Sequence, residues 1–244
     1  MTIQIYCDIA DHETIRKYSQ YKIVKGFTTN PSLMRKAGAK NYEQYAKKIL
    51  KITNKPVSLE VFADNNKEII KQAYKLNSFG KNVFVKIPVI TSKKKFTGDV
   101  IKHLNLKGIK LNITAVYNFE QVKKICSFIK SDSKVIISIF AGRMADSGID
   151  PLPIFKKSVK LTKKNNNIKI LWASTREAYN YLQAKQLQCN IITMPPKIID
   201  QISNFGKSSN QLTLDTVKGF LVDAKSSKFS IKWKVKSLNF FLFY

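Results

Sequence analysis

A lysine within an apolar strand is the residue of this sequence whose surroundings most clearly suggest chemistry. Lys86 lies in the run VFVKIP at residues 83–88, which is typical of a buried strand. Burial disfavours the charged ammonium and favours the free amine, and a free amine forms Schiff bases with carbonyl compounds. The sequence therefore predicts a Schiff-base lysine at Lys86. The alternative is a lysine in a structural ion pair with Glu60 or Asp8.

Two carboxylates belong to other predicted strands. Asp8 ends the first strand of the chain, and Glu60 lies on the third. A pair of carboxylates that point into one pocket can serve as general acid and general base. The alternative for both is charge compensation of Lys86.

Two arginines and a serine follow later strands. Arg143 comes after the sixth strand, and Ser174 and Arg176 come after the seventh. Arginine binds phosphate groups through paired hydrogen bonds. We also expect Ser174 and Thr175 to lie at the N-terminus of a helix, where backbone N–H groups attract anions. These residues predict a phosphate site, and the alternative for each arginine is a surface ion pair.

Short β-branched runs alternate with amphipathic segments from one end of the chain to the other. Helical periodicity occurs over residues 67–79, with Asn66 as the expected N-cap, and over residues 119–130. The expected strands are residues 3–8, 25–29, 57–62, 83–89, 111–116, 135–140, 168–173 and 191–194. This alternation predicts an α/β fold, a closed (β/α)8 TIM barrel. An open doubly wound sheet is the alternative, but no GxGxxG follows the first strand.

A barrel of this kind has its active site at the carboxyl ends of its strands. The polar residues that the sequence places there are Asp8, Thr28, Asn30, Glu60, Lys86, Asn112, Thr114, Ser138, Arg143, Ser174 and Arg176. Each of them alone is compatible with a structural role. Their joint placement favours one shared site.

The chain carries 43 Lys and Arg against 16 Asp and Glu, a formal net charge of +27. The lysines are spread along predicted helix faces, as at residues 47–48, 156–157 and 163–164, rather than gathered in one tail. We therefore interpret them as solvated surface residues and do not expect a nucleic-acid partner. The alternatives are attraction for sugar phosphates and a barrel without catalysis that binds nucleic acid or anionic surfaces.

Cysteines and histidines are few. Three cysteines without a CxxC spacing and two histidines predict neither a disulfide framework nor a metal site. The sequence shows no apolar run of about 18 residues and no signal peptide, so we expect a cytoplasmic protein without a membrane partner. Residues 1–231 are expected to form one barrel domain with an additional C-terminal helix at 214–225. Residues 232–244 form a basic and then apolar tail.

Six segments of the sequence resemble the transaldolase family, and they occur in the order in which the family has them. The segments are residues 25–33 (KGFTTNPSL), 58–61 (SLEV), 85–88 (VKIP), 111–117 (LNITAVY), 138–143 (SIFAGR) and 173–176 (ASTR). The first resembles the family's TTNPSL signature, and the last two resemble its phosphate-site segments. One such segment would be weak evidence, whereas six in order are specific.

The resemblance implies roles for individual residues. Lys86 matches the Schiff-base lysine, and Asp8 matches the acid/base group for cleavage of the carbon–carbon bond. Glu60 and Thr114 match a pair that holds a water molecule for proton transfer. The residues implied to surround the substrate are Thr28, Asn30, Asn112, Ser138, Phe140, Arg143, Ser174 and Arg176. The chemistry implied needs neither a metal nor an organic cofactor.

The implied reaction is that of the pentose phosphate pathway. A dihydroxyacetone unit passes from sedoheptulose 7-phosphate or fructose 6-phosphate to an aldose phosphate. The alternative is the cleavage of fructose 6-phosphate with release of dihydroxyacetone. Aldolases with that activity tend to have tyrosine at the position of Phe140, so Phe140 together with Glu60 favours transfer. The compact length resembles short subfamilies that often form rings of ten subunits, which implies a homo-oligomer whose C-terminal helix crosses a subunit boundary.

Two features depart from the family pattern. Residues 88–98 form a longer and more basic link than the family usually has after its lysine, and Trp172 stands where smaller residues are usual. A specialised sugar phosphate therefore remains an alternative substrate.

Overall fold

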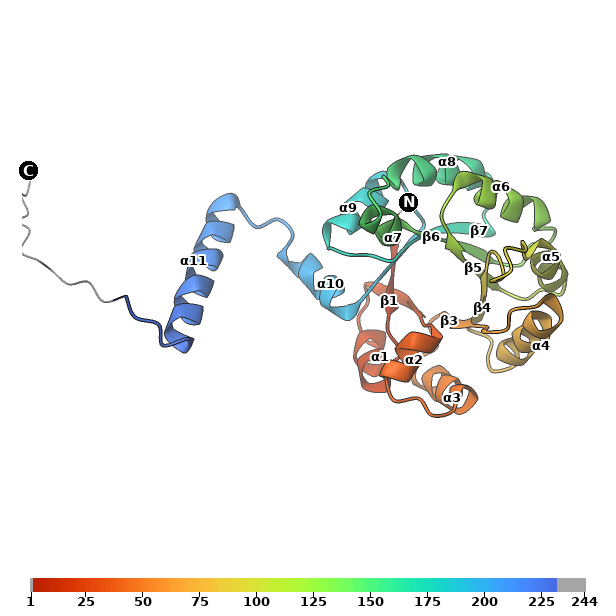
Figure 1. Cartoon of the computed structure of the whole chain (residues 1–244), viewed down its shortest axis with the longest axis horizontal. Coiled ribbons are helices and arrows are strands. Elements are labelled where there is room, and N and C mark those ends of the chain that lie inside the picture. The colour runs from red at the N-terminus through yellow and green to blue at the C-terminus, as the bar shows by residue number, and fades with distance from the viewer. Residues whose placement is uncertain (1, 232–244) are drawn as a thin grey trace, which may run out of the picture. The chain divides into compact units, whose positions relative to one another are not determined.

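Eight parallel strands close into a barrel in a computed structural model that describes residues 2–231 (Figure 1). The strands neighbour one another in sequence order, and the eighth pairs with the first. They are β1 (Gln4–Asp8), β2 (Val24–Thr28), β3 (Val57–Glu60), β4 (Val83–Pro88), β5 (Leu111–Val116), β6 (Val135–Phe140), β7 (Ile168–Ala173) and β8 (Ile191–Met194). Each expected strand is confirmed to within two residues at either end. The predicted tail at 232–244 lies outside the described residues.

Helices connect the strands and surround the barrel, which confirms the TIM-barrel prediction (Figure 1). They are α1 (His12–Ser19), α2 (Pro31–Lys36), α3 (Tyr42–Ile52), α4 (Asn66–Asn77), α5 (Gly98–Leu106), α6 (Phe119–Phe128), α7 (Ala141–Asp146), α8 (Leu152–Thr162), α9 (Tyr179–Gln186) and α10 (Pro196–Gln201), which a short 3-10 turn (Ile202–Asn204) follows. The expected N-cap of α4 was wrong by one residue. Asn65 accepts the hydrogen bond of the Glu68 backbone N–H, and Asn66 is already helical.

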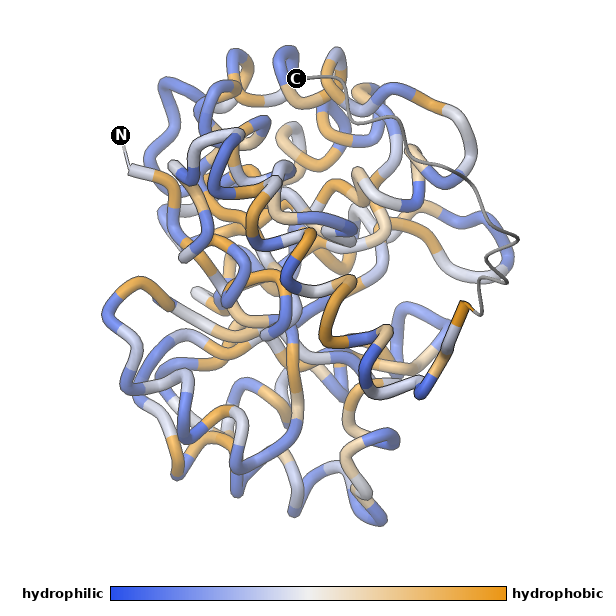
Figure 2. The backbone as a smooth tube through the Cα atoms, turned by 90° about the vertical axis from the view of Figure 1, so that its left-hand side faces the viewer, coloured by the Kyte–Doolittle hydropathy of each residue, from blue (hydrophilic) through white to orange (hydrophobic). Residues whose placement is uncertain are grey.

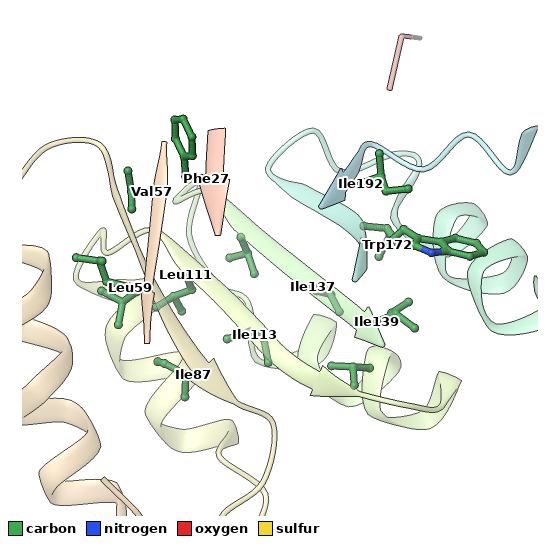
Figure 3. Close-up of a cluster of buried hydrophobic side chains, with 14 of the residues drawn as sticks. Phe27, Val57, Leu59, Ile87, Leu111, Ile113, Ile137, Ile139, Trp172 and Ile192 are labelled. Carbon is green, nitrogen blue, oxygen red and sulfur yellow. The ribbon is translucent and has the colours of Figure 1, made fainter. Parts of the chain in front are cut away.

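The outer core lies between the strands and the helices. Parallel strands covered by helices must be apolar on the covered face, and large apolar side chains of β2 to β8, many of them isoleucine or valine, supply that face (Figure 3). Trp172 belongs to this layer, because its ring stacks on Phe155 of α8 with ring centroids 4.4 Å apart. It is 1% exposed and does not line the cavity described below. The unusual size of Trp172 is therefore accommodated by packing against a helix.

The barrel interior has an apolar layer of its own. Tyr6, Phe84, Ile136 and Leu171 form a cluster separate from the outer core. Successive residues of a strand point to opposite faces, so the residues two positions later point inward as well, one layer nearer the carboxyl ends of the strands. On β1, β4 and β6 those residues are polar, namely Asp8, Lys86 and Ser138. The apolar layer thus lies beneath a polar one.

Hydrophobic and hydrophilic segments alternate along the tube in Figure 2, as expected when each helix turns one face toward the barrel. Within residues 2–231 the chain divides into two compact units, one that ends at Ser203 and one that begins at Asn204. In the second unit, α11 (Ser209–Ser226) contains the helix predicted at 214–225, and its Phe220 and Leu221 side chains are exposed. Among the described residues, no helix is long and apolar enough to cross a bilayer.

Candidate active site

A cavity of about 360 Å³ opens at the carboxyl ends of the strands. It brings together eleven of the twelve residues that the sequence predicted for the site, namely Asp8, Thr28, Asn30, Lys86, Asn112, Thr114, Ser138, Phe140, Arg143, Ser174 and Arg176. Glu60, the twelfth, is not among the lining residues but forms an ion pair with Lys86. Ser32, Leu33, Lys36, Ala173 and Thr193 complete the lining, and sequence reasoning missed them.

Lys86 lies on β4 and lines the cavity. In the sheet, β4 lies between β3 and β5. Lys86 is paired in register with Glu60 of β3 and with Asn112 of β5. Nζ lies 2.9 Å from Glu60 Oε2 and donates a hydrogen bond to the carbonyl of Thr29 at 3.2 Å. The residue is 7% exposed. The ion pair with Glu60 that was considered as an alternative for Lys86 is therefore present, on an amine that also faces the cavity.

Glu60 is held by a tyrosine that sequence reasoning missed. The hydroxyl of Tyr42, from α3, donates a hydrogen bond to the carbonyl of Glu60 and accepts one from its backbone N–H, both at 3.0 Å. Burial raises the pKa of the Tyr42 hydroxyl, so it remains protonated. Because Tyr42 acts through the backbone of another element, no motif in the sequence could have revealed it.

Asp8 ends β1 and accepts a 2.6 Å hydrogen bond from the hydroxyl of Thr28. That hydroxyl also lies 2.5 Å from the hydroxyl of Thr193 on β8. Burial raises the pKa of the Asp8 carboxyl above its usual range, while the charge of Lys86 and the Thr28 hydrogen bond act in the opposite direction. Thr193 could have been found from its place near the end of the eighth strand.

The Asn112 side chain is fixed from two sides. Ser138 donates a hydrogen bond to its Oδ1 at 2.6 Å, and its Nδ2 donates one to the hydroxyl of Ser58 at 2.9 Å. The hydroxyl of Thr114, two residues later on β5, is buried and has no hydrogen-bond partner among the described residues. The cavity therefore offers an oriented amide and an unused hydroxyl close to Lys86.

Asn30 has a local structural role as well as a place in the cavity. It is the N-cap of α2, and its side chain accepts a hydrogen bond from the backbone N–H of Leu33 at 2.9 Å. Pro31 follows as the first helical residue, where the missing N–H costs little. The sequence Asn-Pro thus starts a helix directly at the rim of the site.

Gly142 and Ser174 lie against each other and bring two loops together. A Cβ on Gly142 would lie 1.7 Å from the carbonyl oxygen of Ser174. Ser174 has a φ of +64° and turns the chain sharply after β7. The helix N-terminus expected at Ser174 and Thr175 was wrong, because this turn delays α9 until Tyr179. Backbone N–H groups of a helix N-terminus are therefore not available at Ser174, and the predicted anion site depends on side chains instead.

Arg143 and Arg176 line the same cavity but have different partners. Arg176 forms an ion pair with Asp146 of α7, with Nη2 2.5 Å from Oδ2 and Nε 3.1 Å from both carboxylate oxygens. This pair lowers the pKa of Asp146. The guanidinium of Arg143 lies 5.5 Å from the ring centroid of Phe140. The surface ion pair considered as an alternative for Arg176 is present, although the residue still faces the cavity.

Among residues 2–231, no group of three or more His, Cys, Asp or Glu side chains is arranged to hold a metal ion. The cysteines at 7, 126 and 189 are unpaired thiols. Burial raises the pKa of Cys189 to about 12 and that of Cys126 to about 11, so neither is a ready nucleophile. Within the described chain, the candidate chemistry is that of one amine, two carboxylates and the hydroxyls around them.

Known proteins resemble the chain over nearly its whole length. The family model described as transaldolase/fructose-6-phosphate aldolase matches residues 5–237. A probable transaldolase of Herpetosiphon aurantiacus is 31% identical over 222 residues, 91% of this chain and 94% of that protein. A probable transaldolase of Nitrosopumilus maritimus is 30% identical over 228 residues, 93% and 96%. One of a Thermoanaerobacter species is 28% identical over 238 residues, 97% and 100%. The chain belongs to the transaldolase/fructose-6-phosphate aldolase family.

Proposed function

We propose that this protein is a transaldolase, which transfers a dihydroxyacetone unit from a ketose phosphate to an aldose phosphate through a Schiff base on Lys86. One observation carries the proposal: the buried amine of Lys86 lies 2.9 Å from the Glu60 carboxylate and shares a cavity with Asp8. The names of the relatives support the same reaction. Sedoheptulose 7-phosphate and fructose 6-phosphate are the donors we propose.

The first step is formation of the imine. Glu60 takes a proton from the Lys86 ammonium, and the freed Nζ attacks C2 of the ketose. Glu60 then passes this proton to the C2 oxygen, which also receives the second proton that the nitrogen loses and leaves as water, so that a protonated imine remains. Glu60 is within hydrogen-bond distance of the amine, as a general base must be. The Thr114 hydroxyl, which has no partner among the described residues, can hold the water that relays the proton.

The second step breaks the bond between C3 and C4. Asp8 takes the proton of the C4 hydroxyl, a carbonyl forms at C4, and the electron pair of the C3–C4 bond moves onto the protonated imine. An aldose phosphate leaves and an enamine stays on Lys86. Because burial raises the pKa of the Asp8 carboxyl, this group is a better proton acceptor than an ordinary aspartate. The imine is the electron sink, so the chain's own amine supplies what a cofactor would.

The third step reverses the second with a new partner. The enamine carbon attacks the aldehyde of the acceptor, Asp8 returns its proton to the new hydroxyl, and water releases the ketose from Lys86. Asn112 and Asn30 face the cavity and can hydrogen-bond the hydroxyls of the bound three-carbon unit. Arg143 and Arg176 hold the phosphate at the other end of the substrate.

The alternative outcome for the enamine is protonation, which releases free dihydroxyacetone. Phe140 bears on the choice, because its ring packs against Tyr117, with centroids 5.7 Å apart, and offers no hydroxyl to the cavity. This arrangement favours transfer over protonation.

The test is to incubate the protein with fructose 6-phosphate, with and without the acceptor erythrose 4-phosphate. Sedoheptulose 7-phosphate and free dihydroxyacetone are then quantified. Formation of sedoheptulose 7-phosphate that depends on the acceptor supports the proposal. If dihydroxyacetone were released equally fast with and without the acceptor, the protein would be an aldolase and the proposal of transfer would fail. Lys86→Ala is the control for either reaction, and activity that survived in this variant would exclude the mechanism.

A further inference from the structure

The net positive charge that the two arginines bring to the cavity is smaller than the negative charge of a phosphate group. Arg143 and Arg176 carry two positive charges there, but Asp146 is paired with Arg176 at 2.5 Å. Arg143 also acts on Asp146, because it helps to lower the pKa of that carboxyl. Two guanidinium groups and one carboxylate leave a single net positive charge. A phosphate monoester carries about 1.5 to 2 negative charges at neutral pH.

A third cation, Lys36, lines the same cavity. It is the last residue of α2 (Pro31–Lys36), the helix that Asn30 caps at the rim of the site. Ser32 lines the cavity too, and residues four apart lie on the same side of a helix. One face of α2 therefore forms a wall of the site, with the lysine at its far end.

The position of Lys36 in the barrel places it across the cavity from Arg143. Lys36 follows β2, whereas Arg143 follows β6. In a closed barrel of eight strands in sequential order, the second and sixth strands are on opposite sides. Since one cavity is lined by both residues, an anion between them is approached by positive charge from two directions.

Lys36 is available to a ligand. Among residues 2–231, it forms no ion pair with a carboxylate within 4.0 Å, and its side chain is exposed. Arg35 precedes it on the same short helix and is also exposed, but it does not line the cavity. The chain thus offers a neighbouring cation that differs from Lys36 chiefly in the direction it faces.

We propose that Lys36 is the third cation of the phosphate site, holding the phosphate of donor and acceptor from the α2 wall while Arg143 holds it from the opposite wall and Arg176 from the segment after the adjacent strand β7. The inference rests on the proposed function and deepens it. Lysine acts as a flexible point charge, so Lys36 can follow the phosphate as the substrate changes length. It takes no part in bond making. Its effect is selection of phosphorylated over uncharged substrates.

The test compares Lys36→Gln with the matched control Arg35→Gln and with Lys36→Arg, which keeps the charge. Each protein is first incubated with unphosphorylated dihydroxyacetone and reduced with borohydride. An equal adduct on Lys86 in all of them shows that the fold and the amine chemistry are intact without involving a phosphate. The KM and kcat for fructose 6-phosphate are then measured at several salt concentrations.

The expected result is a KM for fructose 6-phosphate about fivefold higher in Lys36→Gln, the size of an exposed ion pair, with kcat unchanged. Its kcat/KM should also fall less steeply with added salt. Arg35→Gln should match the wild type, and Lys36→Arg should recover most of the affinity. Equal KM values in Lys36→Gln and Arg35→Gln would overturn the inference. So would weaker trapping of dihydroxyacetone in Lys36→Gln, since that would reveal a role in shaping the cavity.

Failure of the proposed function would be visible separately. If the wild-type protein traps no dihydroxyacetone and turns over no ketose phosphate, the Schiff-base proposal fails. In that case, the role of Lys36 is tested by calorimetry, which measures the affinity of Lys36→Gln and Arg35→Gln for inorganic phosphate. Weaker binding in Lys36→Gln than in Arg35→Gln would keep Lys36 in an anion site, and equal binding would remove it.

Discussion

The carbonyl oxygen of Ser174 occupies the space that a side chain on Gly142 would need. A Cβ built on Gly142 would lie 1.7 Å from that oxygen, and no flexible side chain is in between to give way. Gly142 precedes Arg143, and Ser174 lies two residues before Arg176. This backbone contact therefore sets the spacing of the two arginines that face the cavity.

Gly142→Ala should push the Ser174 turn away and separate the two arginines. We expect kcat/KM for fructose 6-phosphate to fall on the order of a hundredfold, since a misplacement of about 1 Å has that effect. The free energy of unfolding should fall by about 1–3 kcal/mol because of the overpacking. Steady-state kinetics and urea unfolding measure the two effects. Gly219→Ala is the control, because nothing lies within 4 Å of its added methyl group. Wild-type kinetics in Gly142→Ala would contradict the assigned role of the contact.

Asp8→Asn should abolish transfer and stabilise the fold. Burial is the largest influence on the Asp8 carboxyl and raises its pKa, so the folded protein binds this proton more tightly than the unfolded chain. The wild type therefore loses stability as the pH rises from about 4, the ordinary aspartate pKa, through the raised value. The side-chain amide of the Asp8→Asn variant does not ionise, so the variant does not lose stability in this way. We expect the Tm advantage of Asp8→Asn to be large at pH 8 and to vanish near pH 4. A Tm below that of the wild type at every pH would show that the charge of Asp8 stabilises the fold.

Glu60→Gln should slow imine formation while leaving the cavity in place. The amide has the same shape but cannot take the proton of Lys86, and removal of a general base typically costs about a hundredfold to ten-thousandfold in rate. Quenching with borohydride at increasing times measures the formation of the adduct. Tyr42→Phe removes two hydrogen bonds to the Glu60 backbone and should produce a smaller loss of the same kind. If the adduct formed at an unchanged rate in Glu60→Gln, Glu60 would not be the general base and would only compensate the charge of Lys86.

Phe140→Tyr should shift the enamine toward protonation. The substitution places a hydroxyl in the cavity beside Tyr117 and Arg143, where the present ring offers none. We expect release of free dihydroxyacetone from fructose 6-phosphate without an acceptor to increase and transfer to decrease. An enzymatic assay of dihydroxyacetone measures the change, and Phe140→Leu controls for disturbed packing. If Phe140→Tyr released no more dihydroxyacetone than Phe140→Leu, the ring position would not control this choice.

The strands and the site residues on them could be predicted because both depend on local patterns. A buried parallel strand is a short apolar run, and a polar residue within it, such as Lys86 or Asn112, has only the barrel interior to face. Periodicity does not fix the ends of an element, and so the cap of α4 was placed at Asn66 rather than Asn65. This error did not affect the site, because the cap of α4 lies outside it and the residues on the strands depend on strand position.

The residues that the sequence did not reveal act through tertiary contacts. Tyr42 holds Glu60 by its backbone, Ser58 orients Asn112, and Lys36 reaches the cavity from the end of a helix. None of these roles leaves a periodic or spaced signal. The helix start expected at Ser174 failed for a related reason, since the left-handed turn there is set by the contact with Gly142.

Trapping of the covalent intermediate tests the central claim most directly. The protein is incubated with fructose 6-phosphate and reduced with borohydride, and the modified peptide is located by mass spectrometry, with Lys86→Ala treated in parallel. The account predicts an adduct with the mass of a reduced dihydroxyacetone unit on Lys86, and none in the variant. An adduct on another lysine, or no adduct with fructose 6-phosphate, sedoheptulose 7-phosphate and dihydroxyacetone in turn, would contradict it.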